Sequence, residues 1–190
     1  MENQSKAIFA GTEEKKSPKS GSCELILRLL AFVLTLAAAI VIGTDKQTKV
    51  VPIKIADSLP PFNVPVSAKW HYLSAFVYFM VANAIACAYG AISMLLTFLN
   101  RGNSKVLLGT LITMLDTLMV ALLFSGNGAA AAVGLLGYNG NSHVRWSKVC
   151  DVFDKFCHQV AASIILSLLG SLAFLLLIVI LPILRFQRRT

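Results

Sequence analysis

One long apolar run constrains this chain more than any other feature. Residues 105–136 read KVLLGTLITMLDTLMVALLFSGNGAAAAVGLL, and Asp116 is the only ionisable side chain after Lys105. Because about 18 consecutive apolar residues already indicate a membrane-spanning helix, the run predicts a lipid bilayer as its solvent. An ionised carboxylate near the centre of a bilayer costs roughly 3 kcal/mol. Asp116 must therefore face the protein interior, a water-filled cavity or a counter-charge.

The composition also indicates a membrane protein. Of the 190 residues, 56% are hydrophobic and 14% are charged, whereas roughly a quarter of the residues of a soluble domain are charged. The net charge of +8 raises the question of a nucleic-acid partner. However, the lysines and arginines stand in short segments between apolar runs and form no stripe with interleaved aromatic residues. We therefore expect no nucleic-acid partner and interpret the charge as a sign of topology.

Four apolar segments are long enough to cross a bilayer, and they divide the chain into one transmembrane domain, residues 25–185, with polar flanks. The predicted spans are residues 25–43, 71–99, 106–136 and 159–184. The remainder is predicted to be a disordered tail, two loops and a short basic tail, at residues 1–24, 44–70, 137–158 and 186–190. A cleaved signal peptide is an alternative for the first span, because Ala37–Ala39 resembles a cleavage site. The long polar segment before the span and Arg28 within it argue against cleavage.

Basic residues near the span ends predict the topology. Four spans place both termini on one side of the membrane, and the side richer in basic residues faces the cytoplasm. The residues within a few positions of a membrane edge on that side are Arg101, Lys105, Arg185, Arg188 and Arg189. We predict an all-α bundle of four transmembrane helices with both termini cytoplasmic and with both long loops outside.

Two cysteines share the second outer loop, in the stretch CDVFDKFC. A disulfide between Cys150 and Cys157 is favoured if this loop faces an oxidising space, as the charge distribution predicts. Free thiols are an alternative, and so is a metal site with His143 or His158. The Cys-x6-Cys spacing matches no standard zinc site. We predict a disulfide, and neither a metal nor a cofactor.

Two charges lie inside the predicted spans. Arg28 is about one turn inside the first span, and Asp116 is about ten residues inside the third. We predict a buried pair that locks the two helices, since opposite charges in hydrocarbon relieve one another's desolvation. In the alternative, Arg28 snorkels to the inner interface with the help of Glu24, one turn earlier. Depths of about 5 and 15 Å favour the alternative, but the third apolar run exceeds the bilayer core and can slide inward.

Small residues recur at four-residue spacing in three spans. Such stripes let helices approach closely, within one chain or between chains, and packing within one bundle accounts for most of them. The stripes are Ala82, Ala86 and Gly90; Gly126, Ala130 and Gly134; and Ser163, Ser167 and Ser171. Spans with so few polar groups indicate no water path, which argues against a channel. The sequence contains no catalytic motif, and we therefore predict that the protein is not an enzyme.

Several of these features together resemble one family. Arg28, Asp116, the stretch AAAAVGLLGYNGN (129–141) and the stretch WSKVCDVFDKFC (146–157) resemble the Casparian strip membrane domain protein-like family of plants, which is similar to the four-span MARVEL proteins. The resemblance covers residues from about 25 to 185. It implies a plasma-membrane protein that forms homo-oligomers, and hetero-oligomers with family members. Arg28 and Asp116 match the family's intramembrane basic and acidic positions, and Cys150 and Cys157 match its outer-loop cysteines.

The founding members of that family build an immobile membrane platform that guides local lignin deposition in the root endodermis. The first outer loop of this chain, KVVPIKIADSLPPFNVPVSAKW (49–70), does not resemble their first-loop signature. This difference argues against a role in the Casparian strip itself. We predict a self-associating scaffold of the plasma membrane that marks a membrane domain for local cell-wall modification. The alternative is a transporter or channel subunit that uses Asp116.

Overall fold

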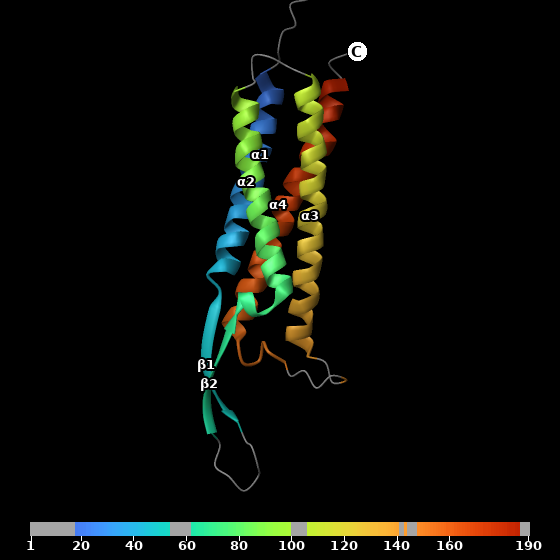
Figure 1. Cartoon of the computed structure of the whole chain (residues 1–190). Helices are drawn as coiled ribbons and strands as arrows, with labels where there is room; N and C mark the ends of the chain where they lie inside the picture. Colours follow the sequence, from blue (N-terminus) through green and yellow to red (C-terminus); the bar gives the residue numbers. More distant parts are fainter. Residues whose placement is uncertain (1–17, 54–61, 100–105, 141–142, 144–147, 187–190) are drawn as a thin grey trace, which may run out of the picture.

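Four long helices run side by side (Figure 1). A computed structural model describes residues 18–53, 62–99, 106–140, 143 and 148–186. The helices are α1 (Pro18–Gly43), α2 (Ser74–Leu99), α3 (Val106–Asn139) and α4 (Asp154–Phe186). Between α1 and α2 the chain forms strands β1 (Lys46–Ile53) and β2 (Phe62–Lys69), followed by the short 3-10 helix η1 (Trp70–Tyr72).

Each helix contains an apolar segment long enough to cross a membrane. The four segments are Ser22–Gly43, Ser74–Leu99, Leu107–Asn139 and Asp154–Ile180. Large apolar side chains such as Leu29, Ile92, Leu118 and Val179 are exposed on the outside of the helices. An apolar outer surface of this extent is unfavourable in water and suited to hydrocarbon. The predicted bundle of four transmembrane helices is therefore confirmed, and the chain is a membrane protein with four spans.

The helices form a closed ring in which α1 and α3 each pack against both α2 and α4. The start of α1, the end of α2, the start of α3 and the end of α4 lie together, and we call this the termini end. The opposite end carries the β1–β2 hairpin, and we call it the hairpin end (Figure 1).

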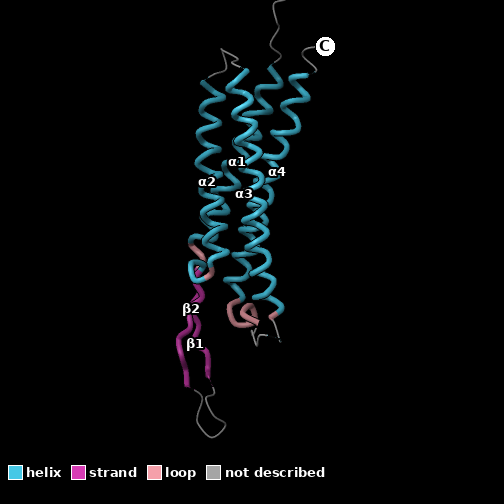
Figure 2. Tube along the Cα trace, turned by 45° about the vertical axis from the view of Figure 1, so that its right-hand side comes forward, coloured by secondary structure: helices cyan, strands magenta, loops and turns pink. Residues whose placement is uncertain are grey.

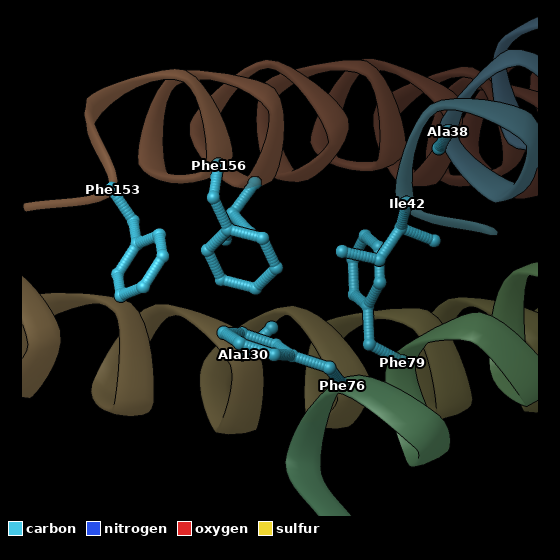
Figure 3. Packing of buried hydrophobic residues seen from close by; sticks show 8 residues of the cluster. Ala38, Ile42, Phe76, Phe79, Ala130, Phe153 and Phe156 are labelled. Atoms are coloured by element: carbon cyan, nitrogen blue, oxygen red, sulfur yellow. The ribbon is translucent and has the colours of Figure 1, made fainter. Parts of the chain in front are cut away.

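The interior contains two apolar clusters, one toward each end. In the cluster toward the hairpin end, the rings of Phe76 and Phe156 meet edge to face with centroids 6.1 Å apart (Figure 3), a favourable aromatic geometry. Its members are Ala38, Ile42, Phe76, Phe79, Ala130, Phe153, Phe156 and Val160. The cluster toward the termini end consists of Ala31, Ala86, Leu123, Ala173, Phe174 and Leu177.

The first loop is a hairpin that projects beyond the helices (Figure 2). Its antiparallel strands pair from Lys46 opposite Lys69 to Ile53 opposite Phe62. The sequence predicted a loop here, with short extended pieces around VVPIKI (50–55), and β1 contains residues 50–53 of this stretch. Its β-branched residues favour strands, and the prolines at 52 and 65 are tolerated because a two-stranded sheet consists only of edges.

Two hydrogen bonds fix the root of the hairpin. Trp70 Nε1 donates to the Gly43 carbonyl at 3.0 Å, which joins the two ends of the hairpin. The Phe156 N–H donates to Gln47 Oε1 at 3.0 Å, which ties β1 to α4.

The helix ends differ from the predicted span ends. The helix α1 begins at Pro18, within the predicted tail, α3 continues to Asn139, and α4 begins at Asp154. A helix can extend past the hydrocarbon because polar residues are solvated there, and proline is compatible with a first turn. Gly140, with φ 69°, ends α3 by donating its N–H to the Leu136 carbonyl. The predictions for residues 1–17, 100–105 and 187–190, and Trp146, lie outside the described residues.

Candidate functional site

Two opposite charges meet inside the bundle, one from α1 and one from α3. Arg28 Nη1 donates to Asp116 Oδ1 and Arg28 Nη2 donates to Asp116 Oδ2, both at 3.3 Å. Arg28 is 1% exposed and Asp116 is 0% exposed. Two such bonds between a guanidinium and a carboxylate form a strong bidentate pair. The structure thus brings together the two residues that the sequence analysis pairs.

The pair forms because α1 and α3 begin at the same end of the bundle (Figure 1) and because the two residues lie about equally far along their helices. Arg28 follows Pro18, the first residue of α1, by about ten residues, and Asp116 follows Val106, the first residue of α3, by about ten. At about 1.5 Å per residue, each lies about 15 Å from its helix start. The expected depth difference came from a first span that was taken to begin at residue 25. No inward sliding of α3 is needed.

Further partners complete the hydrogen bonding of Arg28. Its Nε and Nη2 donate to Glu24 Oε1 at 3.3 and 3.2 Å, and its Nη1 donates to Ser93 Oγ of α2 at 3.1 Å. A guanidinium has five N–H groups, and these bonds together with the pair to Asp116 engage all five. Glu24 is the partner expected if Arg28 snorkelled. Arg28 binds Glu24 but is buried instead of reaching the interface.

Asp116 also contacts α2. The Tyr89 hydroxyl lies 2.7 Å from Asp116 Oδ1 and 3.0 Å from the carbonyl oxygen of Ile112. A hydroxyl donates one proton, and the charged carboxylate is the stronger acceptor. Ser93 Oγ in turn donates to the Gly90 carbonyl at 3.1 Å. These contacts join α1, α2 and α3 in what we call the charged cluster: Glu24, Arg28, Tyr89, Ser93 and Asp116.

Tyr89 and Ser93 were not predicted from the sequence, although a signal is present. The two are four residues apart in the second span and therefore lie on one helix face. Polar side chains within a span need hydrogen-bond partners from neighbouring helices. That spacing marks both as candidate partners of a charge on a neighbouring helix, and the structure selects them.

The small-residue stripes face the interior of the same chain. Eight of the nine predicted positions are buried, and Gly134 is half-buried. A Cβ added to Gly90 would lie 3.5 Å from Phe32 Cα, and one added to Gly126 would lie 3.3 Å from Ala82 Cβ. These glycines therefore allow close contact of α2 with α1 and of α3 with α2. The other buried positions are Ala86, Ala130, Ser163, Ser167 and Ser171.

A polar layer separates the two apolar clusters. Asn127 Nδ2 of α3 donates to Ser171 Oγ of α4 at 3.3 Å, and Ser171 Oγ donates to the Ser167 carbonyl at 2.8 Å. Among the described residues, Asn83 Oδ1, Asn127 Oδ1 and Ser167 Oγ are buried without a hydrogen bond. Unsatisfied polar atoms are costly inside a membrane. Ser167 and Ser171 were predicted as helix-packing positions, whereas Asn83 and Asn127 were not predicted.

A disulfide lies at the hairpin end. Cys150 and Cys157 are joined, with their Cα atoms 5.6 Å apart. The Gly137 carbonyl of α3 accepts a hydrogen bond from the Cys150 N–H at 3.3 Å, which holds the loop on the bundle. His158, considered as a metal ligand, lies instead 3.3 Å from Asp154 at an exposed position. Within the described ranges, no three His, Cys, Asp or Glu side chains gather in a group that could hold a metal.

A second buried carboxylate stands at the root of the hairpin. Asp45 is 0% exposed, and neither of its carboxylate oxygens has a hydrogen-bond partner in the part of the chain that the structure describes. Burial raises the pKa of Asp45 from 3.8 to about 7, and the nearby Lys155 ammonium partly opposes this increase. The protonation state of Asp45 therefore changes near neutral pH.

The family follows from a comparison with known proteins. A family model described as the Casparian strip membrane protein domain matches residues 17–173. The chain belongs to this family. CASP-like protein 1E1 of Glycine max is 70% identical over 170 residues, which cover 90% of this chain and 89% of the relative. CASP-like protein 1E1 of Populus trichocarpa is 59% identical over 185 residues, 94% of each chain. CASP-like protein 1E1 of Arabidopsis thaliana is 52% identical over 184 residues, 95% and 97% of the two chains.

The predicted family is thus confirmed, and the chain is a CASP-like multi-pass membrane protein of a plant. No solved structure matches this CASP-like chain. The range matched by the family model includes every residue of the charged cluster and both disulfide cysteines.

Proposed function

We propose that this CASP-like protein is a non-catalytic scaffold of the plasma membrane that associates with copies of itself and with other family members. The closed charged cluster is the observation that supports this proposal most. Every N–H of Arg28 and both carboxylate oxygens of Asp116 are engaged. A proton relay needs a carboxylate that exchanges its proton. A carboxylate held on both oxygens by a guanidinium is better suited to fixing three helices in a rigid frame.

Charge and cysteine chemistry support an orientation for the scaffold. In the sequence, the basic residues at 101, 105, 185, 188 and 189 stand in or next to the helix ends that meet at the termini end, and we place this end in the cytoplasm. A disulfide persists in an oxidising space, which supports an outer location for the loop that contains Cys150 and Cys157. In this orientation, the hairpin extends toward the cell wall, where a scaffold can mark a membrane domain for local wall modification.

The proposal is tested with two differently tagged full-length copies in one plant cell. We expect them to be isolated together in mild detergent, and we expect a fluorescent copy to gather in a slowly exchanging membrane domain. An unrelated four-span protein with the same tag is the control and should exchange freely. A fluorescent copy that bleaches in single steps and diffuses like the control would show a mobile monomer and would refute self-association.

A transporter or channel subunit is the second candidate function, and the polar layer is the observation that favours it. Asn83 Oδ1, Asn127 Oδ1 and Ser167 Oγ offer hydrogen-bond partners to a permeating molecule within the bundle. Reconstituted protein separates the two functions, because a scaffold passes no protons or ions. Flux that wild-type vesicles show and that Asn127→Leu abolishes, with normal folding, would select the transporter.

A further inference from the structure

We propose that a cleft between α3 and α4 at the hairpin end binds one acyl chain of a membrane phospholipid. The cleft has a volume of about 340 Å³, a size typical of small-molecule sites. The disulfide loop and α2 complete its walls. The residues that carry the argument are Gly134, Leu135, Tyr138, Val149, Phe156 and Ala161.

Small residues on two facing helices create the cleft. A Cβ added to Gly134 would lie 4.0 Å from Val160 Cγ1, and one added to Gly137 would lie 4.0 Å from Cys150 Sγ. At Gly126, in contrast, an added Cβ would lie 3.3 Å from Ala82. At Gly134 and Gly137, which line the cleft, an added Cβ would therefore have one neighbouring atom at the limit of ordinary contact, whereas at Gly126 it would meet a tightly packed helix.

The position of the cleft determines its occupant. Its α3 and α4 residues belong to the membrane-spanning segments Leu107–Asn139 and Asp154–Ile180. Leu135 and Tyr138, which line the cleft, are also exposed on the outside of the bundle, so the cleft opens toward the surrounding lipid. Apolar cavities exclude water. The apolar material available at this depth is the acyl chain of a lipid.

Two lysines are placed to bind the phosphate of the same lipid. Lys148 and Lys155 are exposed, and each directly precedes a residue that lines the cleft. The exposed Tyr138 belongs to the same end, and tyrosine is enriched where hydrocarbon meets headgroups. A phospholipid with its chain in the cleft would therefore find cationic groups near its headgroup.

The test uses the full-length protein in phosphatidylcholine vesicles. A small fraction of the lipid carries a photoactivatable diazirine near the end of one acyl chain, and peptide mass spectrometry locates the cross-links. We expect them to concentrate on residues 131–138 and 156–164. The reference position is Ile40, which is exposed on α1 in the same half of the bundle.

Matched variants assign the labelling to the cleft. Ala161→Leu fills the cleft, whereas Ala162→Leu adds the same atoms at the neighbouring exposed position, which does not line it. The first should lower cleft labelling to the level of Ile40, and the second should leave it unchanged. Lys148→Gln should lower cleft labelling by about twofold to fivefold, the effect of one exposed ion pair. Lys49→Gln on β1 should not.

Equal labelling of the cleft and of Ile40 in the wild-type protein would overturn the proposal, because lipid would then contact only the outer surface. Cross-links from the cleft to a second copy of the protein, in place of lipid, would also overturn it. Gly134→Leu fills the same space from α3 and provides a second test if Ala161→Leu does not fold. Cleft labelling that persists in a folded Gly134→Leu variant would contradict the assignment.

Discussion

Removing either charge of the Arg28–Asp116 pair should destabilise the bundle, and the two removals should differ in size. Arg28→Leu removes the partner of two carboxylates at once, the buried Asp116 and Glu24, whose side chain is 17% exposed. Asp116→Asn leaves Arg28 with Glu24 as a counter-charge. Breaking a buried ion pair costs about 3–5 kcal/mol. We expect Arg28→Leu near the upper value and Asp116→Asn near the lower one.

A double-mutant cycle measures the coupling. The free energy of unfolding is followed in mild detergent as a denaturing detergent is added, together with delivery to the cell surface. The double variant Arg28→Leu, Asp116→Asn should lose less stability than the sum of the two single losses. The difference, which is the coupling energy, should be about 2 kcal/mol for residues in direct contact. Exchanging the two charges should recover less, because the carboxylate introduced at position 28 would lie one turn from Glu24. Thr117→Val, on the exposed face of α3, is the control and should change little.

Two results would refute this reasoning. If the single variants are as stable as the wild-type protein, or if their effects simply add, Arg28 and Asp116 are not coupled. If Asp116→Asn folds and reaches the surface normally but loses an ion or proton flux, the carboxylate serves transport.

Three further predictions concern the hairpin end and the topology. Asp45 has a pKa of about 7 in the folded protein, so it keeps a proton that the unfolded chain has lost above about pH 4. The free energy of unfolding should therefore fall as the pH rises from 4 to 7. Thermal unfolding of Asp45→Asn should lack this dependence. At pH 8 the free energy of unfolding of the variant should exceed that of the wild-type protein by at most about 4 kcal/mol. Cys150→Ser should keep the bundle folded but lower its stability by roughly 2–3 kcal/mol, the value of closing a short loop. Unreduced peptides of the native protein should contain Cys150 joined to Cys157, and two alkylatable thiols would contradict this. A tag after Thr190 should be inaccessible from outside intact cells, and labelling it there would reverse the topology.

The four spans could be predicted because a bilayer requires long apolar runs, which are visible in any sequence. The start of α1 at Pro18 could not, since polar residues outside the hydrocarbon can be helical or irregular at similar cost. The hairpin was predicted only in part, as a loop with short extended pieces. Its two strands of eight residues contain Pro52 and Pro65, which indicate a loop unless the strands are known to be edges.

The charged cluster could be predicted only in part. Arg28 and Asp116 are conspicuous because charges are rare within spans. Tyr89, Ser93 and Asn127 are uncharged, and their roles depend on which helices are neighbours. The apolar pattern of four similar spans does not encode the order of helices around the bundle, so these partners emerged only from the structure.

The separation of the charged pair along the chain has a consequence for synthesis. Arg28 and Asp116 are 88 residues apart. A ribosome adds about 5–20 residues per second, so Arg28 is made about 4–18 s before Asp116. Glu24 is made before Arg28 and stands one turn away, and it can accompany the arginine during this interval. The first span therefore enters the membrane with Glu24 as the counter-charge of Arg28, and Asp116 joins as a second, fully buried counter-charge when the third span arrives.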